Sequence, residues 1–294
     1  GINLAHIDTN NNPCQDFYHY CNGNWQKTFE LPESDARYGS FNEINESNLQ
    51  KIRAIYQRSL RNNASDPNAD LQRLGDFYRT AMDSAKADKL GVSPVSPELD
   101  LISKVKTVED LIVLKSKFDF LGIHLFFYGG VSTDLKNSKV HRFGIRQGGY
   151  GLGDRDYYHA EQHAGIREAY KNYLRQLFVL GGTGYEFAAD HARLVLEFET
   201  RLTEAALTRS QMRDVEKMYN IHRPAELKAL APRIAWDIYF REKKIGWPDS
   251  VNVATTDYIK SVSEILANTP VEVLKIYARA HLLMEAAPFL SSNM

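Results

Sequence analysis

The stretch Ile166–Leu180, "IREAYKNYLRQLFVL", carries the clearest periodic pattern in the chain. Its apolar and aromatic residues recur at three- and four-residue spacing and form one stripe: Ile166, Ala169, Tyr170, Tyr173, Leu174, Leu177 and Phe178. Such a stripe is typical of a helix that buries one face, and the pair Gly181-Gly182 supplies its stop. Similar patterns cover most of the chain, so the predicted fold class is mainly α.

The stretch His159–His163, "HAEQH", directly precedes this helix and suggests a metal site, because two histidines four residues apart on a helix can reach one ion. The zinc-protease motif His-Glu-x-x-His, however, needs a glutamate general base where this chain has Ala160. Glu161 would lie about 100° further around the helix. The variant His-x-x-Glu-His fails at Gln162. We therefore interpret the stretch as a polar surface turn.

Helical spacing also predicts helices over Asn48–Leu60 and over Leu71–Leu90, the second ending at Gly91. Thr107 and Asp110 have the spacing of a capping box, which predicts a helix start there and an end at Gly122.

Two more helices follow. The first runs from Tyr185 to Leu207, and we interpret its His191 as a histidine at the edge of the core rather than a ligand. Its predicted apolar face comprises Phe187, His191, Leu194, Phe198 and Leu202. The second begins with Thr269 as N-cap and Pro270 at the first helical position, and it ends or kinks at Pro288.

The pattern changes between residues 123 and 153. The segments "HLFFYGGVS" and "KVHRFGIRQ" are rich in aromatic and β-branched residues, and "TDLKNS" lies between them, which predicts a β-hairpin. The following "GGYGLG" fits neither the dinucleotide fingerprint nor a Walker loop, so we expect a turn. The predicted architecture is a large multi-helix lobe with one small β-hairpin.

Composition excludes some classes of function. The 294 residues are 43% hydrophobic, enough for a sizeable core in one large or two smaller domains. Basic and acidic residues number 36 and 37, and no basic stripe offers itself to nucleic acid. The longest apolar stretch, "LGIHLFFYGG", is interrupted by His124 and is far shorter than the roughly 20 residues of a membrane-spanning helix.

The residues alone declare no catalytic activity. No Gly-x-Ser-x-Gly elbow is present, and the aromatic surroundings of His19 and Cys21 favour packing over a nucleophile pair. The two cysteines, Cys14 and Cys21, lack the spacing of a zinc site. A mutual disulfide, separate buried thiols or bonds to cysteines outside the chain all remain open.

Six motifs nevertheless resemble, in order, those of the neprilysin and endothelin-converting-enzyme family, and most of all its bacterial PepO-like endopeptidases. They are "PCQDFYHYCNGNW", "RYGSF", "GLGDRDYY", "LTEAALTRSQMRDVEKMYN", "DYIKSVSEIL" and "YARAHLLMEAAPFLS". The resemblance covers essentially the whole chain.

This resemblance implies a zinc endopeptidase that hydrolyses oligopeptides inside a chamber between two mainly helical lobes. The family's zinc ligands lie in a His-Glu-x-x-His helix and a downstream Glu-x-x-x-Asp of the C-terminal half, and this sequence has no His-Glu-x-x-His. We therefore expect an N-terminal part that binds no zinc and is inactive alone. Residues 1–44 would pack on the catalytic lobe, and residues 45–294 would form the non-catalytic, substrate-enclosing lobe, incomplete at its C-terminus.

One site residue follows from the resemblance. Arg37 in "RYGSF" matches the family arginine that contacts the C-terminal side of the bound peptide, and a guanidinium suits that role because it pairs bidentately with carboxylates. Some members carry a second cleft arginine eight residues on, where this chain has Asn45. Cys14 matches a family cysteine that bonds to the distant C-terminal region. Vertebrate members have a cysteine at Asn22 rather than at Cys21, so the disulfide pattern cannot be transferred.

The implied partners are a peptide substrate and a C-terminal catalytic lobe, without nucleic acid or membrane contact by this chain. The implied location is extracytoplasmic: periplasmic, secreted, or anchored through a segment outside these residues. Two other hypotheses stay open. One is a stand-alone helical module that binds peptides or proteins without catalysis, and the other is an independent metalloenzyme that uses His159 and His163.

Overall fold

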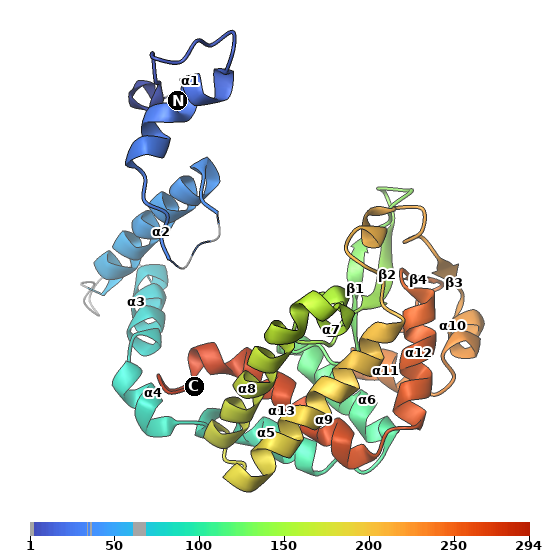
Figure 1. Ribbon diagram of the computed structural model, residues 1–294. Helices are drawn as coiled ribbons and strands as arrows, with labels where there is room; N and C mark the ends of the chain where they lie inside the picture. Colours follow the sequence, from blue (N-terminus) through green and yellow to red (C-terminus); the bar gives the residue numbers. More distant parts are fainter. Residues whose placement is uncertain (1–2, 34, 36, 61–68) are drawn as a thin grey trace. The chain divides into compact units, whose positions relative to one another are not determined.

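A computed structural model of the chain describes all residues except 1–2, 34, 36 and 61–68 (Figure 1). Contacts divide the chain into two compact units, Gly1–Asp83 and Ser84–Met294. This boundary groups the helices up to residue 83 with the leading segment. The predicted division at residue 44 refers to contacts with a catalytic lobe and stays a prediction.

The first unit is a string of helices. They are η1 (Leu4–His6), α1 (Phe17–Thr28), α2 (Ser40–Ser59) and α3 (Ala69–Ala81). Asp16 caps α1 by accepting a hydrogen bond from the backbone N–H of His19 at 3.0 Å. Helices α2 and α3 pack closely at Gly75, where a Cβ atom would lie 2.7 Å from the carbonyl oxygen of Ser59.

Two helix boundaries differ from the prediction in this region. Helix α2 begins at Ser40 instead of Asn48, because Ile44 and Leu49 are five residues apart and so interrupt the three- and four-residue spacing that the pattern detects. The expected helix over 71–90 is two helices, α3 and α4 (Ser84–Leu90), with Met82 and Asp83 between them in the sequence. Aspartate and serine, which stand at this break, favour helix starts over helix interiors. Gly91 ends α4 with φ +55°, as predicted.

The second unit holds most of the core. Its helices are α4, η2 (Ser93–Val95), α5 (Ser96–Ser103), α6 (Val108–Phe120), α7 (Arg155–His159), η3 (Glu161–His163), α8 (Ala164–Leu180), α9 (Tyr185–Glu204), η4 (Gln211–Arg213), α10 (Pro224–Leu230), α11 (Trp236–Glu242), α12 (Thr256–Ala267), α13 (Val271–Ala286) and η5 (Ala287–Phe289). The mainly α class is confirmed. None of the helices among the described residues is long and apolar enough to cross a bilayer.

The predicted hairpin is present and is part of a four-stranded sheet. Strands β1 (Phe127–Thr133) and β2 (His141–Gln147) pair antiparallel, with Phe127 opposite Gln147. Two short strands, β3 (Ile221–His222) and β4 (Val251–Val253), extend the sheet in the order β1-β2-β4-β3, with β2 and β4 parallel. Strands of two and three residues carry no readable alternation, which is why the sequence pattern did not reveal them.

Two hydrophobic clusters form the core. One lies between the inner face of the sheet and helices α6, α11 and α12, where Phe127 and Phe143 meet Tyr239 edge to face at centroid distances of 5.4 and 6.3 Å. The other lies between α8, α9 and α13, which run side by side in Figure 1. Buried Tyr170, Leu174, Leu177 and Phe178 come from the predicted stripe of α8, whereas Ile166 and Tyr173 are each 40% exposed.

Local signals performed unevenly in this unit. The capping box at Thr107 and Asp110 is confirmed, and Gly122 has the expected positive φ of +80°. The predicted N-cap at Thr269 is wrong: Pro270 is the N-cap of α13, and the Thr269 hydroxyl donates to the carbonyl of Ile265 at the end of α12. The sequence rule could not detect this competing acceptor.

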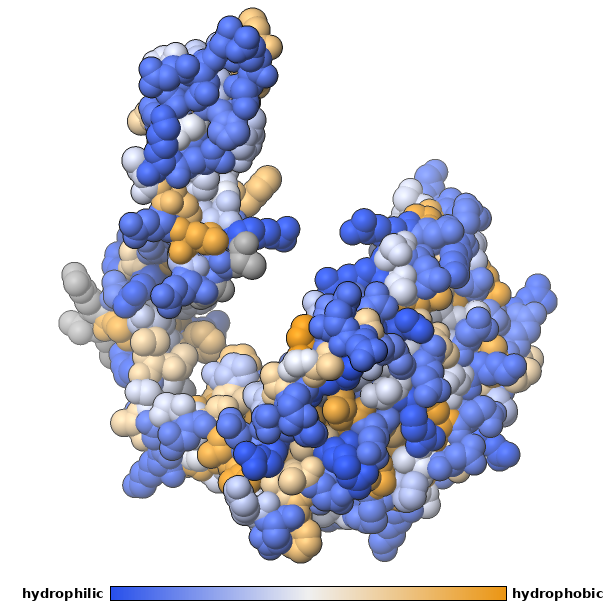
Figure 2. All heavy atoms as spheres, in the orientation of Figure 1, coloured by the Kyte–Doolittle hydropathy of each residue, from blue (hydrophilic) through white to orange (hydrophobic). Residues whose placement is uncertain are grey.

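Hydrophobic residues also remain at the surface of both units (Figure 2). In the first unit Phe41 is 89% exposed and Ile44 57%, although both lie on α2. Exposed apolar side chains on a helix face are typical of a surface that packs against another segment or protein.

Candidate functional site

Arg37 lies between α1 and α2, and its neighbour Tyr38 contacts a residue at the end of α1 and a residue of α2. The Tyr38 ring stacks on Phe29 at a centroid distance of 4.4 Å, and its hydroxyl donates to Glu46 of α2 at 2.8 Å. This hydrogen bond, together with burial, raises the pKa of Tyr38 to about 12. The side chain next to Arg37 is therefore held from both sides, by Phe29 after α1 and by Glu46 on α2.

The Arg37 side chain itself is exposed and forms no hydrogen bond or ion pair with any described residue. A guanidinium without a carboxylate partner keeps its five donors for a ligand, and it can bind a carboxylate bidentately or cap peptide carbonyls. Asn45, where some relatives have an arginine, is also exposed and lies on α2. Its short amide cannot supply a second positive charge.

The two cysteines are separate thiols in this structure. Cys14 is exposed in the turn before α1, and Cys21 is partly exposed within α1. A mutual disulfide, one of the alternatives left open by the sequence, is not formed.

The two histidines of "HAEQH" point to different partners. Helix α7 ends at His159, Ala160 has extended dihedrals, and His163 ends the short helix η3. His159 Nε2 lies 3.1 Å from the Thr203 hydroxyl, whereas the His163 ring contacts Tyr157 edge to face at 4.9 Å. The two histidines therefore lie on different short helices, separated by the break at Ala160, and do not share one helix face.

A buried carboxylate that the sequence interpretation missed lies under this turn. Glu199 of α9 is fully buried and accepts hydrogen bonds from the hydroxyls of Tyr158 (2.6 Å) and Tyr170 (3.0 Å). His281 Nε2 of α13 lies 2.8 Å from its other oxygen. Burial and the Glu199 charge raise the pKa of both tyrosines, so they remain neutral donors. We call these four residues the Glu199 cluster.

A sequence signal for Glu199 did exist. The buried residues of α9 are Ala188, Ala192, Val195, Phe198, Glu199, Leu202 and Thr203. This face is rotated by about one residue from the predicted one, and Phe187 is 58% exposed. Glu199 follows Val195 by four residues, so a carboxylate on the buried stripe was the clue. His191 is partly buried, with its ring 5.3 Å from Phe178, as expected for the core edge.

A second buried charged group lies beneath the sheet. The ammonium of Lys115 is 3.0 Å from Asp119 and 2.9 Å from the carbonyl oxygen of Phe127, and it lies 4.1 Å from the centroid of the Phe127 ring. Burial lowers the pKa of Lys115 to about 8. Asp119 also accepts from Tyr239 (3.0 Å) and faces Lys243 at 3.4 Å. The group has no opening to solvent at Lys115, which is 0% exposed, so its role is structural.

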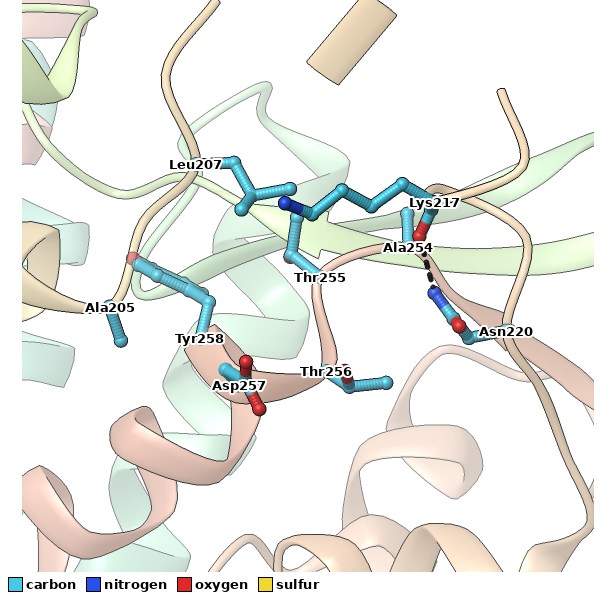
Figure 3. A pocket seen from close by; sticks show the side chains of 9 residues that line it. All are labelled: Ala205, Leu207, Lys217, Asn220, Ala254, Thr255, Thr256, Asp257 and Tyr258. Atoms are coloured by element: carbon cyan, nitrogen blue, oxygen red, sulfur yellow. Dashed lines mark hydrogen bonds between the residues drawn. The ribbon is translucent and has the colours of Figure 1, made fainter. Parts of the chain in front are cut away.

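Two of the quoted motifs meet around a cavity of about 220 Å³ (Figure 3). Lys217 and Asn220 come from the segment before β3, and Asp257 comes from the start of α12. Asn220 donates to the carbonyl of Lys217 at 2.8 Å, and the Lys217 ammonium extends across Thr255 while the Asp257 carboxylate points elsewhere. These two described charged groups form no ion pair. The cavity therefore has no acid–base pair and no set of metal ligands.

Comparison with known proteins gives the family. The family described as "Peptidase family M13" matches residues 13–294. The chain belongs to peptidase family M13. Endothelin-converting enzyme 1 of Bos taurus is 28% identical in an alignment of 308 positions that covers 99% of this chain and 40% of that protein. Neprilysin-3 of Drosophila melanogaster is 26% identical in an alignment of 311 positions that covers 98% of this chain and 39% of that protein.

Solved M13-like structures agree. An inhibitor complex of zinc metalloprotease ZMP1 from Mycobacterium tuberculosis superposes with a TM-score of 0.90 at 26% identity, covering 99% of this chain and 45% of that one. PepO from Lactobacillus rhamnosis has a TM-score of 0.75 at 16% identity, covering 96% of this chain and 45% of that one, and this likeness concerns the fold. The chain spans about two fifths of the length of the curated M13 relatives above, of which it covers 39–40%.

Relatives of this chain are named as zinc metalloproteases, which raises the question of whether its own side chains could hold a zinc ion. The described residues contain no group of three or more His, Cys, Asp or Glu side chains arranged to hold a metal ion, and the whole sequence lacks His-Glu-x-x-His. The donors present here therefore do not fit a catalytic zinc site, and no step of hydrolysis can be derived from this chain's residues.

Proposed function

We propose that this chain forms the substrate-enclosing N-terminal part of a zinc-dependent endopeptidase that hydrolyses oligopeptides. Zinc, the general base and the groups that stabilise the oxyanion would come from a C-terminal catalytic region. The match of residues 13–294 to peptidase family M13 carries this proposal. The chain's own task is then to bind the peptide, to exclude water and to keep folded proteins away from the metal.

Arg37 is the residue that we propose binds the peptide, on its C-terminal side. Its exposed guanidinium, free of described carboxylate partners, and the anchored side chain of Tyr38 support this role. A site beside a residue that is already anchored by stacking and a hydrogen bond loses less conformational entropy when a ligand binds. Asn45 leaves a single cleft arginine, so we expect a weaker preference for a free C-terminal carboxylate than with two.

The exposed apolar residues of the first unit support a packing role for the leading segment. Phe17 is 67% exposed and Phe41 is 89% exposed. Large apolar side chains that are exposed to this degree are typical of a surface that packs against a partner. We propose that residues 1–44 pack on the catalytic region and that residues 45–294 belong to the enclosing lobe. We also propose an extracytoplasmic location, which the family resemblance implies.

The stand-alone binding module is not favoured, because the chain's relatives include proteins named as zinc metalloproteases and converting enzymes. The metalloenzyme based on His159 and His163 is disfavoured by their separate partners.

Zinc content and peptidase activity test the proposal. We expect the purified 294-residue chain to hold no stoichiometric zinc and to cleave no peptide. The same chain joined to an M13 catalytic region should bind stoichiometric zinc and cleave peptides. His159→Ala serves as the control and should not change zinc content. Stoichiometric zinc in the chain alone that is lost in His159→Ala would instead support the independent metalloenzyme.

A further inference from the structure

The outer face of the sheet carries a groove of about 530 Å³, larger than the cavity in Figure 3 and within the range of ligand sites. It extends across β1, β2 and β4. Among the residues that line it are His124, Tyr128, Gly130, Gly144, Arg146 and Asn252. None of these residues takes part in the Glu199 cluster.

The floor of the groove is bare backbone. Gly130 and Gly144 lie directly opposite each other in the β1–β2 pairing. Neither has a positive φ, a Cβ at Gly130 would meet no atom within 4 Å, and one at Gly144 would meet only the Gly130 carbonyl oxygen at 3.7 Å. Glycine weakens a strand, so neither conformation nor packing explains the pair, whereas close approach of a ligand backbone does.

The wall beside this floor is built around Tyr128. Tyr128 and Arg146 form the neighbouring cross-strand pair on the same face, with the guanidinium 5.0 Å from the ring centroid. The His124 ring contacts Tyr128 at 4.6 Å. The ring lies against Gly148, where a Cβ would come within 2.1 Å of it. Tyr128 is thereby held in one orientation and keeps 36% of its surface exposed.

The groove is positively charged. Arg146 is exposed and has no carboxylate partner among the described residues, and no Asp or Glu lines the groove. His124 lies 3.2 Å from Asp119, but that single carboxylate already faces the ammonium groups of Lys115 and Lys243. The surroundings of Arg146 therefore favour an anion.

We propose that this groove binds a short peptide segment that carries a carboxylate. The peptide backbone crosses the Gly130–Gly144 floor, and its carboxylate pairs with Arg146 beside Tyr128. The apolar side chain of Leu135, which also lines the groove and is 54% exposed, gives the peptide's own side chains a surface to cover. The inference deepens the proposed function, on which it rests, by giving the enclosing lobe a peptide-binding surface of its own, separate from Arg37 of the leading segment.

Peptide binding to the zinc-free 294-residue chain tests this site without any hydrolysis. The probes are two alanine-rich pentapeptides with blocked termini and a central glutamate or glutamine, titrated by isothermal calorimetry. We expect the glutamate peptide to bind about tenfold more tightly, since hydrogen bonds between charged groups are the stronger ones. Arg146→Gln should abolish that difference. Gly130→Val should weaken both peptides at least tenfold without lowering the thermal midpoint, because its side chain fills the groove and not the core.

Lys139→Gln, outside the groove on the same hairpin, is the matched control and should bind like the unchanged chain. Equal binding of both peptides by the unchanged chain, Arg146→Gln and Gly130→Val would overturn the inference, even if the enzyme with its catalytic region cleaves peptides. A Gly130→Val chain that binds both peptides normally but no longer associates with the catalytic region would overturn it too, because the face would then be an interface between lobes. Absence of zinc-dependent cleavage with intact groove binding would count against the proposed function alone.

Discussion

Glu199 and His281 are 82 positions apart in the sequence, yet an oxygen of the Glu199 carboxylate lies 2.8 Å from Nε2 of His281 in the interior of the second unit. The contact joins α9 to α13, and the hydroxyls of Tyr158 and Tyr170 complete the set of donors from α7 and α8. One carboxylate thus ties together four helices of the unit.

Glu199→Ala should destabilise the chain by about 3 kcal/mol or more, because three buried polar partners lose their acceptor. Glu199→Gln should cost less, since an amide oxygen still accepts. Urea unfolding followed by circular dichroism measures both. Glu197→Gln on the same helix is the control: that side chain is exposed and, among the described residues, pairs only with Arg193, so its loss should cost under about 1 kcal/mol. Equal effects at the two positions would contradict the role given to the cluster.

Lys115 gives a pH prediction. Burial lowers its pKa from 10.5 to about 8, so between these values the unfolded chain binds more protons than the folded one and stability rises with pH. The free energy of unfolding of the unchanged chain, relative to that of Lys115→Met, should therefore rise by on the order of 1–2 kcal/mol between pH 7.5 and 9.5. Urea unfolding of both proteins at the two pH values isolates this residue, because all other titratable groups are the same in the two proteins. A constant difference between the proteins would show that Lys115 does not change protonation there.

The sequence predicted what depends on local rules. The capping box of Thr107 and Asp110 and the stop at Gly122 need only residues within one turn, and the hairpin needs only its two strands. The pairing of β2 with β4 is different, because Phe143 and Val251 lie more than a hundred residues apart and three-residue strands have no pattern of their own.

Of the proposed binding residues, some could be identified from the sequence and others only from the structure. Arg37 came from a motif, whereas the Gly130–Gly144 pair needed the strand register before its bare floor could be recognised.

Gly129 and Gly130 are adjacent but should respond differently to alanine. A Cβ at Gly129 would lie 2.3 Å from the Tyr239 hydroxyl, on the packed face of the sheet, while one at Gly130 meets nothing. Gly129→Ala should therefore cost about 1–3 kcal/mol through overpacking, and Gly130→Ala should be neutral or stabilising. Thermal unfolding of the two variants beside the unchanged chain decides this. A loss of similar size at Gly130 would mean that its outer face is occupied within the fold.

Arg37→Gln tests the peptide contact in an enzyme that contains the catalytic region. Loss of a charge-assisted hydrogen bond of about 1.5–3 kcal/mol corresponds to a fall in kcat/KM of roughly tenfold or more for oligopeptides. Because Arg37 is exposed and unpaired among the described residues, the Arg37→Gln variant should unfold at the same thermal midpoint as the unchanged enzyme.

Arg53→Gln, another exposed arginine, on α2, is the matched control for removal of one positive charge. Steady-state kinetics with a peptide acid and its C-terminal amide then give the nature of the contact. If Arg37 pairs with the terminal carboxylate, Arg37→Gln should lower kcat/KM more for the peptide acid than for the peptide amide. If the guanidinium caps peptide carbonyls, the variant should lower kcat/KM equally for both substrates. Unchanged kinetics for both substrates would remove Arg37 from the binding site and leave it as a loop residue beside Tyr38.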